Sequence, residues 1–145
     1  MLKTYTITVT EEQAEIIERA CDLLSRIHMG QLDELAFMAI WGELQQWEGH
    51  EVDGTIAKIG CDVLKHELFG LPSDTSWGIM QCGNDARTAC DIHQVIRHRL
   101  SWDEHPEGGY TVNFHEPFKS GDNALPSIEV IKRTSPFGLN CTKKR

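Results

Sequence analysis

The chain has 145 residues, of which 40% are hydrophobic and 25% charged, and its formal net charge is −8. These values are ordinary for one folded domain and exclude a fibrous or wholly disordered chain. The negative net charge argues against binding of duplex nucleic acid, which depends on Lys and Arg neutralising phosphates. The sequence has no run of 18 apolar residues and no recognisable signal peptide, so membrane insertion is not expected.

The charge is unevenly distributed along the chain. Residues 1–80 hold 5 basic and 14 acidic side chains, whereas residues 81–145 hold 9 basic and 8 acidic ones. An anion-binding site is therefore expected in the second half. The five cysteines form no CxxC pair, which indicates reduced thiols and a cytosolic protein.

Three segments carry the alternation of apolar and polar residues that is typical of strands. The first is residues 3–9, in which Tyr5, Ile7 and Val9 share one face. The other two are residues 110–114 and 128–131, near the end of the chain. We expect the first strand to pair with the two later ones.

Four helices are predicted from apolar residues at helical spacing. Thr10 with Gln13 forms a capping box, and Asp53 and Asn84 are further N-cap residues. The expected apolar face of the third helix ends before Gly70 and Pro72 and consists of Ile56, Ile59, Gly60, Val63, Leu64 and Leu68. The predicted helices cover roughly residues 11–28, 32–47, 54–69 and 85–100.

The order of these elements predicts an α+β fold, with a small antiparallel sheet from an N-terminal strand and C-terminal strands packed with about four helices. Residues 1–133 would form a single domain, and residues 134–145 a loose basic tail. A three-stranded sheet is small for so many apolar helix faces, so we expect a homo-oligomer.

No standard catalytic motif is present, since the sequence lacks GxSxG, a Walker loop, GxGxxG and HExxH. The acidic residues between Glu11 and Asp22 could form a magnesium site, but their pairing with basic residues at i, i+4 favours a solvated helix face. Soft ligands are present but match no common zinc spacing: Cys82, Cys90, His93 and His98. We therefore expect neither a metal nor a cofactor.

A basic cluster near the end of the fourth helix is the best candidate for anion binding. Arg97, His98 and Arg99 are consecutive, and Arg87 and Asn84 precede them on the same helix. Arginine suits phosphate because its planar donors engage two oxygens at once, and Arg97 lies one turn after His93. The alternative is that these cations only complement the helix dipole.

Two loops add groups that suit a nucleotide. Trp77 lies in an aperiodic, Gly-flanked loop, where it could stack on a purine or else plug the core. The break after the first helix gathers Arg26, Met29 and Gln31, which could contact a ligand or simply form a turn. An asparagine amide such as that of Asn84 can read an adenine edge.

At these residues the chain resembles a known family of small bacteriophage proteins. The segments that carry the resemblance span most of residues 5–115 in order, and they are residues 10–14 (TEEQA), 25–31 (SRIHMGQ), 84–98 (NDARTACDIHQVIRH) and 106–114 (PEGGYTVNF). They are similar to the Thoeris anti-defence protein 1 family.

The resemblance implies a non-enzymatic protein that sequesters the cyclic ADP-ribose isomers made by bacterial TIR-domain immune enzymes. Family members hold the signal intact between subunits and form dimers that can assemble into hexamers. Some members also bind cyclic trinucleotides at separate arginine-lined sites. The resemblance thus implies action in the cytoplasm of the infected bacterial host.

The family's pocket residues carry over to this chain in part. Asn84 resembles the pocket asparagine, and Arg97 resembles an arginine of the phosphate-binding set. Position 74, where the stacking aromatic is expected, is Asp, so Trp77 is the substitute. Position 101, where a further arginine is expected, is Ser, and Arg99 is the nearest replacement.

Two other functions remain open from the residues alone. An enzyme that cleaves a cyclic nucleotide could use His93 or His98 as general base and Arg97 on the phosphate. An acidic inhibitor could instead bind a host protein through the negative first half of the chain. Neither accounts for the grouping of Trp77, Asn84 and Arg97 as well as nucleotide sequestration does.

Overall fold

A computed structural model describes residues 3–108 and 114–131 of the chain. The regular structure of these residues is helical, and no strand occurs within them. The predicted α+β fold with an antiparallel sheet is therefore wrong. The helices are α1 (Glu11–His28), α2 (Asp33–Ile40), α3 (Gly54–Phe69), the short 3₁₀ helix η1 (Ile79–Gln81) and α4 (Asn84–Glu104).

The strand prediction failed because alternation alone does not supply a partner strand. Residues 3–9 are not in a sheet, and their apolar side chains face solvent, with Tyr5 79% and Ile7 77% exposed. Residues 128–131 are also outside any strand. The middle predicted strand lies outside the described residues apart from Phe114, as does the predicted tail. A lone extended segment cannot satisfy its backbone by pairing, whatever its side-chain pattern.

The predicted boundaries of α1 and α3 are confirmed, because local capping decides them. The Thr10 hydroxyl accepts from the Gln13 amide at 3.2 Å, and the Gln13 side chain accepts from the Thr10 amide at 2.9 Å. The Asp53 carboxylate accepts from two amides at the start of α3, at 2.9 and 3.1 Å. Gly70 ends α3 in the left-handed conformation.

Helix α2 is shorter than predicted. It ends at Ile40, and Gly42 follows with φ of 73°, which turns the chain out of the helix. The apolar residues that extended the predicted helix are exposed instead, among them Trp47 at 86%. The spacing of apolar residues therefore predicted where this helix starts but not where it ends.

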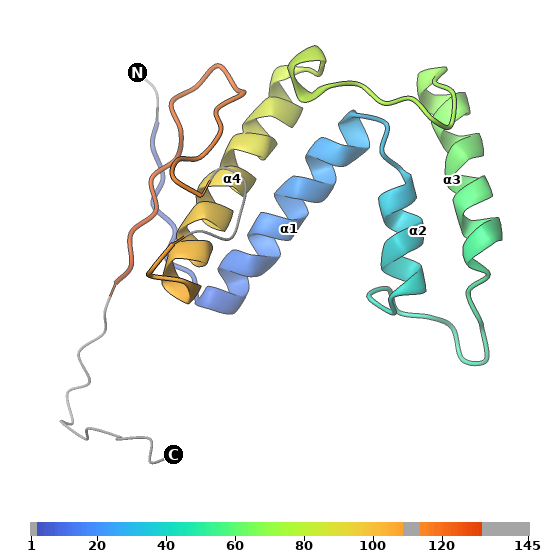
Figure 1. The fold of residues 1–145 in the computed structure, drawn as a ribbon, viewed down its shortest axis with the longest axis horizontal. Helices are drawn as coiled ribbons and strands as arrows, with labels where there is room; N and C mark the ends of the chain where they lie inside the picture. Colours follow the sequence, from blue (N-terminus) through green and yellow to red (C-terminus); the bar gives the residue numbers. More distant parts are fainter. Residues whose placement is uncertain (1–2, 109–113, 132–145) are drawn as a thin grey trace.

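The helices form two pairs. Helix α1 packs against α4, and α2 packs against α3, so that Figure 1 shows them in the spatial order α4, α1, α2, α3. Small buried residues let α1 and α4 approach closely, namely Ala14, Ala86 and Ala89. Leu32, Ala36 and Cys61 form the cluster between α2 and α3.

Helix α3 presents the opposite face from the one that its sequence predicts. Its buried residues are Cys61 and Lys65, with Ala57 and Phe69 partly buried. The residues of the predicted inward face are exposed: Ile56 (67%), Ile59 (56%), Val63 (57%), Leu64 (51%) and Leu68 (67%). Among the described residues no large side chain is fully buried, so much of the apolar surface of the chain remains uncovered.

The segment after α4 returns along that helix and is fixed to it. The Asp91 carboxylate accepts from the Ser120 amide at 2.6 Å, the Ser120 hydroxyl at 2.9 Å and the Gly121 amide at 3.0 Å. Trp102 donates to the Phe114 carbonyl at 2.9 Å, and the two rings are 4.3 Å apart. These contacts place residues 114–122 against the face of α4 that α1 leaves free.

None of the helices within the described ranges combines the length and the apolar character that crossing a membrane requires.

Candidate functional site

The turn between α1 and α2 meets the loop that leads from α3 to α4. The Trp77 amide donates to the Met29 carbonyl at 2.9 Å, and the Cys82 thiol donates to the His28 carbonyl at 3.6 Å. Gly30 makes the turn with φ of 74°, and a Cβ there would lie 2.9 Å from Leu71. The structure thus brings together two loops that the sequence singled out separately.

A polar cavity of about 350 Å³ opens beside this junction. Its volume lies within the usual range for small-molecule sites, about 300–1,000 Å³. Arg26 and Gln31, both predicted site residues, line the cavity, and Trp77 directly follows its last lining residue. The remaining lining residues are Asp33, Glu34, Phe37, Lys65, Ser73, Asp74, Thr75 and Ser76.

Sequence reasoning missed Lys65 as a site residue. It is 7% exposed, and its ammonium donates to the Ser73 carbonyl at 2.9 Å, which holds the 72–76 loop against α3. The sequence pattern gave no signal for it, because His66 and Glu67 follow it directly and the residue reads as part of a polar helix face. A buried lysine needs a specific acceptor.

The charges of this cavity, which we call the turn pocket, are mixed. Arg26 is committed to neighbours, since it donates to Asp22 at 2.6 Å and to Gln31 at 3.3 Å and pairs with Glu34 at 3.6 Å. The bond to Asp22 raises the pKa of Arg26. With three carboxylates among its lining residues, the turn pocket suits hydroxyl and amino donors better than a bare phosphate.

Trp77 is 41% exposed, so it does not plug the core of this chain. Its backbone is anchored to Met29, while its ring remains open to solvent on part of its surface. Trp77 is not itself a lining residue of the turn pocket, but a partly exposed ring on an anchored backbone is preorganised for stacking.

Asn84 and Arg87 lie at the start of α4 and contact the returning segment. Gly83 is the N-cap residue and Asn84 the first residue of the helix, which corrects the predicted cap. The Asn84 side chain accepts from the Asp122 amide at 3.2 Å. Arg87 donates to the Ser120 carbonyl at 3.4 Å and pairs with Asp122 at 3.1 Å.

The basic cluster at the other end of α4 contains one arginine that pairs with no other described residue. Arg99 pairs with Asp103, and their hydrogen bond raises the pKa of Arg99 and lowers that of Asp103. His98 accepts from the Trp102 indole at 3.1 Å and lies beside Phe114. Arg97 makes no hydrogen bond or ion pair with another described residue.

His93 does not join Arg97 at a common ligand, although their spacing suggested it. It is 9% exposed and lies against α1, with Nδ1 2.8 Å from a Glu18 carboxylate oxygen but out of line for a hydrogen bond. Its Nε2 is 3.8 Å from Asp22. His93 is therefore part of the α1–α4 interface.

Asn84 and Arg97 are also far apart within one chain. They are 13 residues apart on one helix, which corresponds to about 20 Å along the axis. A sphere of 1,000 Å³, the upper end for a small-molecule pocket, is only about 12 Å across. The two ends of α4 cannot serve the same small ligand from a single copy.

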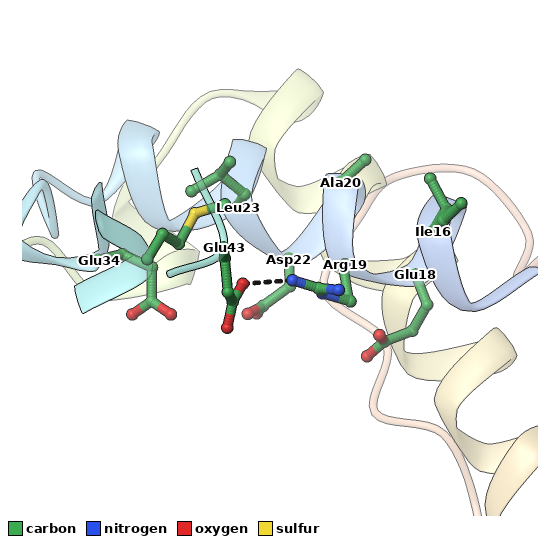
Figure 2. Close-up of a pocket in the computed structure, with 9 residues that line it drawn as sticks. Ile16, Glu18, Arg19, Ala20, Asp22, Leu23, Glu34 and Glu43 are labelled. Carbon is green, nitrogen blue, oxygen red and sulfur yellow. Dashed lines mark hydrogen bonds and ion pairs between the residues drawn. The ribbon is translucent and has the colours of Figure 1, made fainter. Parts of the chain in front are cut away.

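A second cavity, of about 390 Å³, lies between α1 and α2 and contains none of the predicted ligand-binding residues. Figure 2 shows that Glu18, Asp22, Glu34 and Glu43 surround it, with the ion pair of Arg19 and Glu43 across it. This concentration of carboxylates would repel a nucleotide phosphate. Although it is the larger cavity, its chemistry does not fit the predicted ligand.

Within residues 3–108 and 114–131, no group of three or more His, Cys, Asp or Glu side chains could hold a metal ion. Comparison of the chain with known protein families, curated proteins and solved structures finds no match. The functional hypothesis therefore depends on the sequence resemblance and on the chemistry of the residues described above.

Proposed function

We propose that this chain binds cyclic ADP-ribose isomers in the cytoplasm of an infected bacterial host and sequesters them without cleavage, which would block Thoeris-type immunity. The observation that supports this most is the turn pocket, with the partly exposed Trp77 next in sequence to its lining residue Ser76. Together they supply an aromatic ring and hydroxyl, amide and carboxylate groups, and these suit a nucleoside.

The proposed site divides the ligand between two regions of the chain. The adenine would stack on Trp77, and ribose hydroxyls would donate to carboxylates of the turn pocket, such as Asp74. The pyrophosphate would need a free cation, and Arg97 is the uncommitted arginine among the predicted site residues. Because Arg97 lies at the far end of α4, we propose that it comes from a second copy of the chain.

Sequestration requires tight binding of the ground state and no stabilisation of a transition state. The aromatic ring, hydroxyls and guanidinium supply binding, whereas His93, a candidate general base, is buried against α1. Sequestration without cleavage could also apply to cyclic trinucleotides, whose phosphates would contact the arginines of α4.

The first experiment is calorimetric titration of the purified protein with cyclic ADP-ribose isomers, followed by heat release and chromatography of the ligand. We expect binding and recovery of intact ligand. Trp77→Ala should weaken binding by about tenfold or more, as expected for loss of a base stack. Trp47→Ala is the matched control, because Trp47 is 86% exposed in a loop outside the site. Recovery of a cleaved product, or no binding of any isomer, would contradict the proposal.

A mixing experiment tests whether two copies share the site. Trp77→Ala and Arg97→Ala variants should each bind poorly on their own. Co-expressed, they should recover about a quarter of the wild-type sites, because half of the dimers are mixed and one of their two sites has both residues intact. No recovery in dimers shown to be mixed would place Trp77 and Arg97 outside a shared site.

A further inference from the structure

We infer that Lys65 is a ligand-binding residue of the turn pocket and that its ammonium donates to a phosphate oxygen of the bound nucleotide. The inference rests on the proposed function, because it assigns a further residue to the site of the same ligand. It adds to the contact proposed for Arg97, since a pyrophosphate presents two phosphates. Lys65 would act in the same copy of the chain as Trp77.

Lys65 carries a buried positive charge that has no carboxylate partner. The residue is 7% exposed and lines the turn pocket. Its Nζ donates to the Ser73 carbonyl at 2.9 Å but forms no ion pair within residues 3–108 and 114–131, and these ranges contain every Asp and Glu of the chain. An ammonium has three hydrogen-bond donors, so two of them have no described partner. Lysine is rarely buried in this way, because removing a charge from water is costly unless it is paired.

The bond to Ser73 does not by itself account for a charged side chain at this position. Ser73 is exposed, so its carbonyl can bond to water where the lysine is absent. A methionine, which is unbranched and of similar length, could fill the same space without burying a charge. Departures from the ordinary rules of burial concentrate at functional sites, and Lys65 lies at the candidate site.

The exposed and the buried charges of the turn pocket have opposite signs. Asp33 and Asp74 are exposed and form no ion pair with a cation of the described residues, whereas Lys65 is buried. The third carboxylate, that of Glu34, is already paired with Arg26. The turn pocket therefore offers carboxylate acceptors at its exposed edge and an ammonium donor in its interior.

A nucleotide matches this arrangement, because it carries hydroxyl donors and an anion in one molecule. Its ribose hydroxyls can donate to the exposed carboxylates. One of its phosphate oxygens can accept from Lys65 in a charge-assisted hydrogen bond, which is about twice as strong as a neutral one. Inorganic pyrophosphate has no ribose, so the same carboxylates would only repel it.

The test compares the full-length wild type with Lys65→Met, by calorimetric titration with the cyclic ADP-ribose isomer that binds the wild type best. We expect the substitution to weaken binding about tenfold or more, as is usual for loss of a hydrogen bond to a charged group. The melting temperature without ligand should stay the same or rise, because a buried charge is removed. Lys3→Met is the control for charge, since Lys3 is exposed and lines neither cavity.

Adenosine separates a phosphate contact from an indirect effect of Lys65 on the 72–76 loop. It keeps the base and the ribose but has no phosphate, so the wild type and Lys65→Met should bind it equally. If Lys65 only held the loop in place, adenosine and the cyclic isomer would lose affinity by the same factor. Trp77→Ala, by contrast, should weaken the binding of both ligands. Inorganic pyrophosphate should bind the wild type far more weakly than the isomer does.

Three results with Lys65→Met would each overturn the inference: unchanged binding of the isomer, an equal loss of affinity for adenosine, and a melting temperature well below that of the wild type. In each case, binding of the isomer by the wild type would leave the proposed function intact. Pyrophosphate that binds as tightly as the isomer would overturn the assignment of a nucleotide phosphate to Lys65. No binding of any isomer to the wild type would contradict the proposed function, and the inference with it.

Discussion

Asp91 shows how a single residue organises the end of the described chain. It is 3% exposed, and its carboxylate accepts from two backbone amides and one hydroxyl of residues 120–121. A buried carboxylate is tolerated when donors satisfy its oxygens, as they do here. The same segment contacts Asn84 and Arg87, so Asp91 fixes the surroundings of two predicted site residues.

We expect Asp91→Ala to lower the free energy of unfolding by about 3 kcal/mol, because it leaves buried amides without acceptors. Urea unfolding at neutral pH measures the loss. Asp85→Ala is the control, since Asp85 is exposed in the first turn of the same helix and should cost at most about 1 kcal/mol. An equal effect of both substitutions would mean that charge at the helix start, and not the contact with residues 120–121, is what matters.

At the scale of elements, α3 depends on a single side chain for its start. The Asp53 carboxylate caps two amides there, at 2.9 and 3.1 Å. We expect Asp53→Ala to destabilise the protein by about 1 kcal/mol and Asp53→Ser to retain most of the stability, because serine is also a good N-cap. Thermal unfolding compares them with Glu51→Ala, an exposed acidic position before the cap. If Glu51→Ala lowers the unfolding temperature as much as Asp53→Ala does, the loss of stability comes from the change in net charge and not from the lost cap.

The elements also show which parts of the fold the sequence could predict. Caps at Thr10 and Asp53 are local, so the starts of α1 and α3 were correct. Pairing of residues 3–9 with a distant strand depends on the whole chain, and within the described residues it does not form. The burial of α3 was reversed, because periodicity identifies an apolar face but not which neighbour covers it.

The candidate site was predictable in part for the same reason. Arg26, Met29 and Gln31 were recognisable because a helix break gathers polar groups, and Trp77 because a polar loop surrounds it. That they meet at one junction could not be predicted from the sequence, since the loop with Trp77, which lies 48 residues after Met29, supplies half of the junction. Spacing on α4 grouped Asn84 with Arg97, whereas the length of the helix separates them.

At the scale of the whole molecule, ion pairs between partly exposed side chains link the two helix pairs. Arg19 pairs with Glu43 across the acidic cavity, and Arg26 pairs with Glu34 at 3.6 Å. These side chains are partly exposed, and such pairs contribute at most about 1 kcal/mol each. The helix contacts lie mostly within each pair, between α1 and α4 and between α2 and α3, although Ile27 of α1 also packs against the α2–α3 cluster. The coupling between the pairs should therefore be weaker than the cohesion of each.

Native-state hydrogen exchange measures this difference directly. At concentrations below self-association, we expect the amides of α2 and α3 to share one opening free energy and those of α1 and α4 to share another. Glu43→Gln should widen the gap between the two values, and added salt should do the same in the wild type by screening exposed charges. Gln45→Glu, a charge change in the same loop at a side chain with no hydrogen bond to another described residue, should leave the gap unaltered. One common free energy for all four helices would instead mean that they unfold as a single unit, and that the ion pairs between the two halves are stronger than their exposure allows.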